Sequence, residues 1–219
     1  MELTTLTLCC DQSLRENDAR LLRGFFGQRY KNRVEFHHHG PSGLLYQHPL
    51  IQYKAIGGVG RVMGLESGSF LVRALPVIDT LNLNGQTLNV LEQNRNTETI
   101  VFGATEAPVK YQFLSPWFAL NQANHQRYNK LNNRAKRQDL LSRILIGNLN
   151  SLCKSVRLTI TDRLKANLYI EKPKSIEIKS GVILTGFMGT FTVNFQLPPL
   201  WGIGKQSARG FGTVRQIKE

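Results

Sequence analysis

Residues 187–197, FMGTFTVNFQL, decide the fold because apolar or small side chains alternate with polar ones along most of the stretch. The apolar or small members are Phe187, Gly189, Phe191, Val193, Phe195 and Leu197, and the polar members are Thr190, Thr192, Asn194 and Gln196. Successive side chains of a strand point to opposite faces. The stretch therefore predicts a strand with one buried and one solvated face, which is typical of an antiparallel sheet covered on one side.

Shorter stretches around this strand show related patterns. Further strands are expected in 3–8 (LTTLTL), 109–114 (VKYQFL), 155–160 (SVRLTI), 175–179 (SIEIK) and 212–218 (GTVRQIK). Residues 48–58 and 68–78 are also interpreted as strands between glycine turns, whereas 82–100 is at best weakly helical. The strand that starts at Val109 is expected to break at Ser115 and Pro116.

Two stretches have the spacing of helices. Ser13 and Glu16 form a capping-box pattern that predicts a helix from Leu14 to Arg29. A second helix is predicted by an apolar face made of Leu140, Leu141, Ile144, Leu145 and Leu149. If that helix runs back through Asn132 and Asn133, four basic residues line up on one face: Arg127, Lys130, Arg134 and Arg137. The plainer alternative is that this stripe is the wet side of an amphipathic helix.

Strands flank helices in both halves of the chain. This pattern fits two α+β domains, which we expect at residues 1–104 and 105–219. Charge separates the same halves: the first holds 10 Lys and Arg against 9 Asp and Glu, and the second holds 18 against 6. Most of the net charge of +13 therefore lies in the second half, which is suited to binding a polyanion such as a nucleic acid. A basic surface that serves only solubility is the alternative.

Several classes of protein are disfavoured by composition. The 219 residues contain no apolar run of the roughly 18 needed to cross a bilayer, and the start MELTTLTLCCDQ lacks the basic leader of a secretory signal. We therefore expect a cytoplasmic protein with no membrane partner. Cys9, Cys10 and Cys153 are odd in number and show no CxxC spacing, which argues against a disulfide framework and a zinc knuckle.

Four of the five histidines fall within residues 36–48, FHHHGPSGLLYQH. His37 and His39 would face one side if this loop is extended, with His38 turned away. Histidine is suited to general acid–base chemistry because it titrates near neutrality. Two alternatives are a solvated loop and a metal site formed by the HxH pair with His48. No cysteine is near and the nearby carboxylates form no known ligand spacing, so we expect neither a metal nor a cofactor.

A second stretch that suggests chemistry lies near the end of the chain, in GIGKQSARGFG. Glycines at 202, 204, 210 and 212 bracket Lys205 and Arg209. Glycine lets an anion approach the main-chain N–H groups, and the two cations would balance its charge. The loop is thus a candidate for binding phosphate, although neither common nucleotide-binding motif is present. A glycine-loosened hairpin is the alternative.

These motifs together resemble the repeat-processing endoribonucleases of CRISPR systems, within the superfamily of repeat-associated RNA-binding proteins. The similar stretches occur in order along the chain: LLRGFFG, HHHG, YQHPLIQYK, FLSPWFALN, LLSRILIGN and GIGKQSARGFGTV. The resemblance implies two tandem ferredoxin-like (RRM-like) domains with antiparallel sheets. It also implies metal-independent cleavage within the repeats of a precursor RNA, with the 2′-hydroxyl as nucleophile and 2′,3′-cyclic phosphate and 5′-hydroxyl ends. The implied partner is CRISPR repeat RNA, as precursor and mature crRNA, and a CRISPR interference complex and a homodimer are left open.

The resemblance also implies site residues. In the similar branch of the family, His37, His39 and Tyr46 correspond to the active site, with the histidines as base and acid and the tyrosine orienting the phosphate or carrying a proton. Lys54, or Lys205 and Arg209, would supply positive charge, and the basic stripe and glycine-rich loop would bind RNA. Many family members have a catalytic tyrosine in the first helix, but this chain has none before Tyr30.

Two other functions stay open from the sequence. A catalytically silent RNA-binding subunit of the same superfamily would keep the basic half and the glycine-rich loop but would not need paired histidines. A basic scaffold for proteins or membranes is disfavoured, because no amphipathic helix combines a basic face with exposed Trp or Phe.

Overall fold

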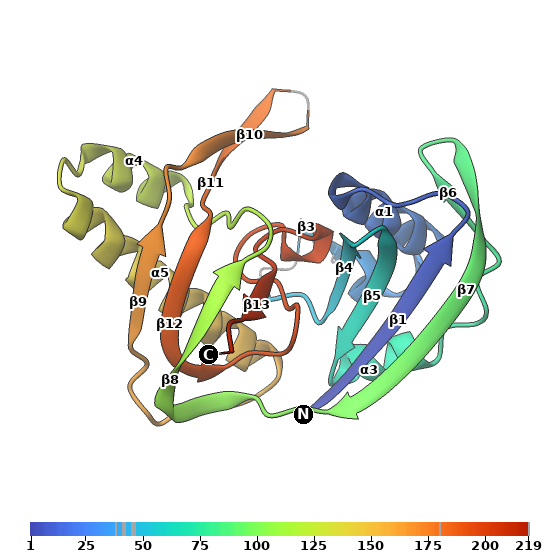
Figure 1. The fold of residues 1–219 in the computed structure, drawn as a ribbon, viewed down its shortest axis with the longest axis horizontal. Coiled ribbons are helices and arrows are strands. Elements are labelled where there is room, and N and C mark those ends of the chain that lie inside the picture. Colours follow the sequence, from blue (N-terminus) through green and yellow to red (C-terminus); the bar gives the residue numbers. More distant parts are fainter. Residues whose placement is uncertain (38, 41–42, 45–46, 180, 219) are drawn as a thin grey trace. The chain divides into compact units, whose positions relative to one another are not determined.

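The computed structural model describes residues 1–37, 39–40, 43–44, 47–179 and 181–218 (Figure 1). The chain divides into two compact units. Unit 1 consists of Met1–Ile100 together with Ala208–Gly210, and unit 2 consists of Val101–Ser207 together with Phe211–Glu219. Both units combine helices with antiparallel strands, so the predicted α+β fold with antiparallel sheets is confirmed.

Unit 1 is built on a five-stranded antiparallel sheet with the order β4-β5-β1-β7-β6. Its elements are β1 (Glu2–Cys10), the 3-10 turn η1 (Glu16–Asp18), α1 (Ala19–Arg29), α2 (Val34–His37), β2 (His39–Gly40), β3 (Gly43–Leu44), β4 (Ile51–Ile56), β5 (Val59–Leu65), α3 (Ser67–Arg73), β6 (Thr80–Leu83) and β7 (Gln86–Thr99). The series β1, α1, β4, β5, α3, β7 is the βαββαβ order of a ferredoxin-like domain. β6 adds a strand beside β7.

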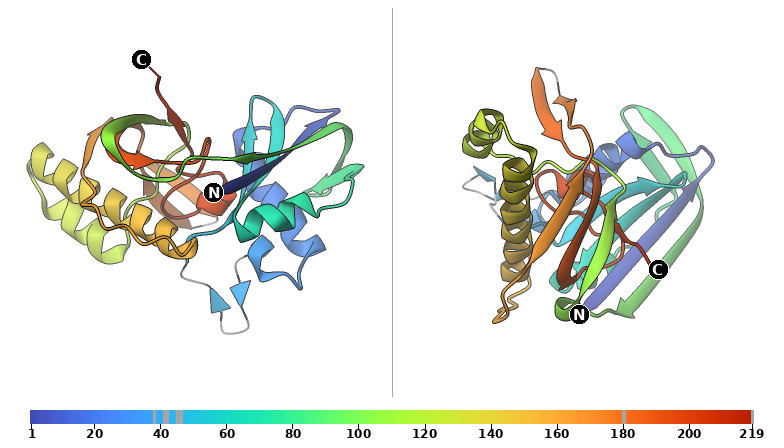
Figure 2. Two further views of the ribbon diagram at one scale, coloured as in Figure 1. Left: turned by 90° about the horizontal axis from the view of Figure 1, so that it is seen from below. Right: turned by 60° about the vertical axis from the view of Figure 1, so that its left-hand side comes forward.

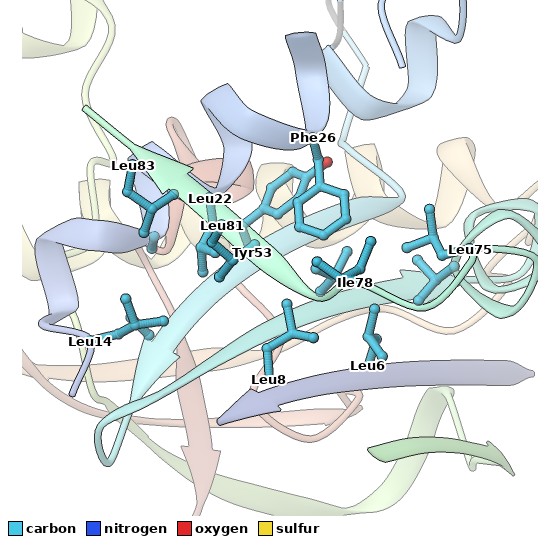
Figure 3. Packing of buried hydrophobic residues seen from close by; sticks show 14 of the residues in the cluster. Leu6, Leu8, Leu14, Leu22, Phe26, Tyr53, Leu75, Ile78, Leu81 and Leu83 are labelled. Carbon is cyan, nitrogen blue, oxygen red and sulfur yellow. The ribbon is translucent and has the colours of Figure 1, made fainter. Parts of the chain in front are cut away.

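The core of unit 1 lies between this sheet and its helices (Figure 3). Leu6, Val62 and Tyr53 occupy one row across β1, β5 and β4, because Leu6 pairs with Val62 and Val62 pairs with Tyr53. Leu22 and Phe26 of α1 pack against the same cluster, and all five side chains are almost fully buried. Leu22 and Phe26 therefore lie on the face by which α1 packs on the sheet.

Three sequence-based expectations for unit 1 were wrong. The helix does not begin at Leu14: η1 comes first, where the Arg15 amide donates to the Asp18 carboxylate (2.7 Å), and α1 starts at Ala19. Residues 68–78 are mainly helical, in α3, rather than extended. Residues 82–100 form the β6–β7 hairpin rather than a helix, with Asn84 and Gly85 both at positive φ in its turn.

Unit 2 is built on a four-stranded antiparallel sheet with the order β13-β8-β12-β9. Its elements are β8 (Gly103–Phe113), α4 (Gln122–Lys130), α5 (Arg134–Ser155), β9 (Ala166–Ile170), β10 (Lys174–Lys179), β11 (Val182–Gly186), β12 (Gly189–Gln196) and β13 (Val214–Gln216). The 3-10 turn η2 (Ser207–Arg209) begins in unit 2 and continues into the Ala208–Gly210 segment of unit 1. The strand order is again ferredoxin-like, with α5 alongside β9 (Figure 2). Between β12 and β13, residues 197–213 form a glycine-rich loop with one 3-10 turn in place of a second helix. Residues 155–160, expected as a strand, instead form the end of α5 and a loop.

The alternation in residues 187–197 has the predicted consequence. Along β12, buried residues alternate strictly with half-buried ones, and Phe191, Val193 and Phe195 are the buried members after Gly189. The Phe191 ring lies 5.2 Å from the ring of Tyr111 and 5.1 Å from that of Phe113, measured between centroids.

None of the described helices has the length and apolar composition that a membrane crossing requires.

Truncating Phe191 should destabilise the protein strongly. Phe191→Ala removes a ring that is 1% exposed and leaves a cavity between Tyr111 and Phe113, so we expect a loss of about 3–5 kcal/mol in the free energy of unfolding. Denaturant unfolding would measure it. Thr192→Ala on the other face is the matched control and should cost less than about 1 kcal/mol. Equal losses in the two variants would contradict the assignment of the buried face.

Candidate functional site

We call residues 36–48 the histidine segment. Its first residues anchor it to unit 1. Phe36, in the short helix α2, is buried, and its ring stacks on that of Tyr30 at a centroid distance of 4.8 Å. The Tyr53 hydroxyl donates a hydrogen bond to the Phe36 carbonyl (3.1 Å). At Gly27 of α1, an added Cβ would lie 3.1 Å from the Cβ of His37, so α1 and α2 pack closely there. These contacts fix the backbone on which His37 lies.

His37 is held at both its backbone and its ring. Its carbonyl accepts a hydrogen bond from the guanidinium of Arg23, and its ring Nε2 lies 2.9 Å from the carbonyl oxygen of Lys31. A carbonyl oxygen only accepts hydrogen bonds, so Nε2 must carry a proton. In the neutral ring Nδ1 is therefore the nitrogen that carries the lone pair.

An extended loop was the condition for His37 and His39 to share one face, and this condition is not met at His37. His37 is the last residue of α2, whereas His39 begins β2 and pairs with Leu44 of β3. Because the chain changes from helix to strand between them, the alternation rule for strands does not relate their side chains. The backbone of His39 is described but its side chain is not, and His38 and Tyr46 lie outside the described residues.

A cluster of arginines lies next to this segment. We call Arg20, Arg23 and Arg209 the arginine cluster. Burial lowers the pKa of Arg209, and the nearby charge of Arg20 lowers it further. Burial likewise lowers the pKa of Arg23, with a further contribution from Arg209. Neither Arg23 nor Arg209 forms an ion pair with a residue that the structure describes.

This cluster joins the two ends of the sequence within unit 1. Arg20 and Arg23 are three residues apart on α1, where side chains at that spacing are neighbours. Arg209 comes from the segment Ala208–Gly210, and a Cβ at Gly210, which has a φ of +90°, would lie only 2.8 Å from the Cβ of Ala19. Like charges held together are electrostatically unfavourable unless an anion joins them, so the arginine cluster is a candidate phosphate site. Arg209 was predicted from the sequence as a site residue, whereas Arg20 and Arg23 were not.

The glycines of the C-terminal loop are largely explained by folding. Gly204 and Gly212 have positive φ, and an added Cβ would overlap the Trp117 indole at Gly204 and the Ile203 carbonyl at Gly212. Gly202 is buried and bridges to Thr213. The main-chain N–H of Gly212 donates to the Pro116 carbonyl (2.9 Å).

Main-chain donors of this loop are thus partly used by the protein itself. The N–H of Lys205 donates to the Phe118 carbonyl (3.1 Å), while its side chain is exposed. Lys205 and Arg209 are therefore the parts of the loop best able to meet a phosphate. The role of the four glycines in binding RNA stays a prediction.

Lys54 is buried and is linked through Gln52 to His48, at the far end of the histidine segment. It is 1% exposed, and its Nζ donates to the Gln52 side-chain oxygen (2.8 Å). This bond orients the Gln52 amide so that its nitrogen donates to Nε2 of the buried His48 (3.1 Å), which must then be unprotonated at that atom. Lys54 and Gln52 alternate along β4 with Tyr53, which contacts Phe36, so they point to the opposite face of the strand. Buried in this way, Lys54 presents no surface to an RNA phosphate.

The buried amine of Lys54 should make the stability of the protein depend on pH. Burial lowers the pKa of Lys54 to about 7. Between that value and the ordinary lysine pKa near 10.4, the unfolded chain binds more protons, so the free energy of unfolding should rise with pH. Lys54→Met should remove this rise, and the stability of the variant relative to the native chain should fall by on the order of 3–4 kcal/mol between pH 7 and 10. Urea unfolding at several pH values measures it, with exposed Lys172→Met as control. A constant difference across this window would contradict the assignment.

The basic stripe is interrupted in the structure. α4 ends at Lys130 and α5 begins at Arg134, because the Asn133 side chain accepts from the Ala135 amide (2.7 Å) and caps the second helix. The condition for a continuous stripe, a helix that runs through Asn132 and Asn133, is therefore not met.

The four stripe residues consequently do different things. Arg127, Lys130 and Arg134 are exposed. Arg137 donates from Nε to the Leu131 carbonyl (2.7 Å), and its guanidinium lies 4.9 Å from the centre of the Tyr128 ring, so it ties α5 to α4. The first turn of α5 holds basic residues and no acidic ones, an unfavourable placement at the positive end of a helix dipole that a bound anion would relieve.

No group of His, Cys, Asp and Glu side chains that could hold a metal ion is found in the described part of the chain. Cys9 and Cys10 are partly exposed free thiols and Cys153 is a buried one.

Two ferredoxin-like units in tandem are the architecture of the CRISPR repeat-processing class that the sequence resembles. Family models of the Cas6b N-terminal domain and the Cas6b C-terminal domain match residues 1–100 and 103–217. The chain therefore belongs to the Cas6b family.

Solved structures agree with this assignment. A crystal structure of Cas6b has 32% sequence identity and a TM-score of 0.89, over 99% of this chain and 100% of that chain. A crystal structure of the CRISPR RNA processing endoribonuclease Cas6b has 30% identity and a TM-score of 0.75, again over 99% of this chain and 100% of that chain.

A relative is also found by sequence. An uncharacterized protein of Methanocaldococcus jannaschii is 37% identical over 142 residues, which are 65% of this chain and 95% of that protein.

Proposed function

We propose that this protein is a metal-independent endoribonuclease that cuts CRISPR precursor RNA within its repeats. Membership of the Cas6b family, one structure of which is described as a CRISPR RNA processing endoribonuclease, supports the general activity. The observation that carries the proposal for this chain is the contact between Arg23 of the arginine cluster and the backbone of His37. It joins a proton carrier and concentrated positive charge within unit 1.

The proposed reaction needs three contributions from the protein. A base removes the proton of the ribose 2′-hydroxyl, whose oxygen then attacks the adjacent phosphorus. The bond from phosphorus to the 5′-oxygen breaks, and an acid protonates that oxygen as it leaves. The products are a 2′,3′-cyclic phosphate and a 5′-hydroxyl, and no external oxidant, water or metal enters the balance. Positive or hydrogen-bonding groups must stabilise the negative charge of the phosphorane.

His37, His39 and Tyr46 fill the proton roles in this proposal. His37 acts through Nδ1, since Nε2 is committed to the Lys31 carbonyl. His39 supplies the second proton function from the start of β2, and Tyr46 orients the phosphate or carries a proton. The arginine cluster supplies the charge that sequence reasoning assigned to Lys54, Lys205 and Arg209. Arg209 therefore keeps its predicted role as a source of positive charge. Lys54 does not, because it is buried.

RNA is held mainly through charge in this proposal. Arg127, Lys130, Arg134 and Lys205 are the exposed basic residues that contact the phosphates, within a half of the chain whose net charge is +12. The substrate is the repeat in the precursor, and the mature crRNA is the product. A CRISPR interference complex and a second copy of the chain are further proposed partners.

Cleavage of the CRISPR repeat RNA from the protein's own genome in excess EDTA tests the proposal. We expect a single cut whose upstream product ends in a 2′,3′-cyclic phosphate and whose downstream product starts with a 5′-hydroxyl. A single 2′-deoxy nucleotide at the cut site should abolish the cut and leave binding intact. Binding without any cut would indicate a catalytically silent RNA-binding subunit, and a cut that requires metal would overturn the mechanism.

A further inference from the structure

An exposed tyrosine in unit 2 has no role in the fold or in the proposed reaction. Tyr169 lies on β9, which is an edge strand of the four-stranded sheet, and the residue is 64% exposed. The guanidinium carbon of Arg134 lies 5.5 Å from the centre of its ring. A single exposed ring is ordinary on a protein surface, so the case for a site at Tyr169 depends on the residues around it.

Tyr169 belongs to a polar face of the sheet. Its strand partner is Thr190 of β12, Thr190 pairs with Gln112 of β8, and Gln112 pairs with Arg215 of β13. Paired residues of neighbouring strands share a face, so these four side chains form one row across the sheet. Gln112 and Arg215 are exposed as well.

The neighbouring row on the same face has a similar character. Thr192 pairs with Asn167 on one side and with Lys110 on the other, and Asn167 and Lys110 are exposed. The opposite face is apolar: Leu168, Phe191 and Tyr111 are buried there. The sheet thus presents an open face with hydrogen-bonding groups, two cations and an aromatic ring at its edge.

A second exposed aromatic residue shows why the charge beside Tyr169 matters. Phe70 on α3 is 61% exposed and has Arg73 at 5.8 Å from its ring, a geometry close to that of Tyr169 and Arg134. Arg73, however, forms an ion pair with Glu2 (3.0 Å), which cancels its charge. Arg134 is exposed and forms no ion pair with any residue that the structure describes. The pair Tyr169–Arg134 therefore combines a stacking surface with uncompensated positive charge.

We propose that Tyr169 is a stacking platform for one unpaired base of the bound RNA, with Arg134 contacting a phosphate of the same nucleotide segment. This inference rests on the proposed function, since it takes the repeat RNA as the ligand. Four-stranded sheets bind single-stranded RNA through aromatic side chains on an open face, and every base has a face that can stack. Charge complementarity selects RNA over a protein partner, because Arg134 lies beside the tyrosine and Lys110 and Arg215 lie farther along the same face, in a half of net charge +12.

Fluorescence of 2-aminopurine tests this site directly. The probe is the repeat RNA made uncleavable by a 2′-deoxy nucleotide at the cut site, with 2-aminopurine placed in turn at each unpaired position. We expect native protein to quench one position strongly. Tyr169→Leu should lose this quench and bind roughly 5- to 150-fold more weakly, and Tyr169→Phe should keep both. Phe70→Leu, the matched control at the neutralised pair, should behave as native.

The outcomes separate this inference from the proposed function. If Tyr169→Leu quenches and binds as the native chain does while native protein cuts the repeat, the stacking site is wrong and the endoribonuclease stands. The same result would assign the exposed ring to another partner, such as a protein. If native protein neither binds nor cuts the repeat RNA, both proposals fall.

Discussion

Replacing His37 by alanine is expected to slow single-turnover cleavage of the repeat RNA by about 10²- to 10⁴-fold, the usual worth of one positioned acid or base. RNA affinity should change little, because the phosphate contacts are proposed for the arginine cluster and the exposed basic residues and not for His37. The rate is measured with protein in excess over RNA, and affinity is measured on the uncleavable 2′-deoxy RNA.

The chain offers a matched control for this variant. His125 is an exposed histidine on α4, outside unit 1, and His125→Ala should cleave at the native rate. If His37→Ala also cleaves at the native rate, or if both variants lose activity equally, the histidine segment is not the active site.

Replacing Arg209 by alanine is expected to slow cleavage by about 10²- to 10³-fold, the usual effect of removing one group that stabilises developing charge. The reason is its place in the arginine cluster, where the pKa of Arg23 responds to its charge. The loss should appear at saturating RNA, since a group aimed at the transition state affects the cleavage step more than binding. Arg209→Lys should recover part of the rate, because it keeps the charge but not the planar pair of donors.

Arg215 is the control for charge alone. It is exposed on β13 in unit 2, so Arg215→Ala should weaken binding in a salt-dependent way and leave the saturated rate unchanged. An Arg209→Ala variant that differs from native only in affinity, as Arg215→Ala does, would show that the arginine cluster binds RNA without taking part in the reaction.

Most of the sheet architecture could be predicted from the sequence because apolar and polar side chains alternate along many of the strands. The stretch around Phe191 has period two without interruption, and its buried and wet faces are those expected. The strand β7 was not predicted because its residues are mostly polar and exposed and show little alternation. Asn84 and Gly85 nevertheless form a sequence pair that is typical of a hairpin turn. The helix α3 was not predicted because it is short and depends on tertiary packing. It lies so close to β4 that a Cβ at Gly68 would overlap the Leu50 carbonyl.

The candidate site was only partly predictable, for a similar reason. Clustered histidines are visible in one short stretch, and the resemblance named His37, His39 and Tyr46. The arginine cluster is not visible, because Arg209 meets Arg23 only after the chain has folded. The burial of Lys54 could not be predicted either. The sequence of β4 is that of an ordinary strand, and the place of β4 at the edge of the sheet is known only from the topology. Asn133, by contrast, is a good N-cap residue, so the break between α4 and α5 had a local signal.

Chemical rescue of the His37→Ala variant in excess EDTA tests whether His37 carries a proton in the cleavage reaction. Imidazole added in the millimolar range should restore cleavage at the native position, with a rate that rises with imidazole concentration, and should have no such effect on Arg209→Ala. That result would show that the missing function is a proton carrier at the position of His37. Cleavage by His37→Ala at the native rate without imidazole would contradict the account, because the proton transfer would then belong to another residue.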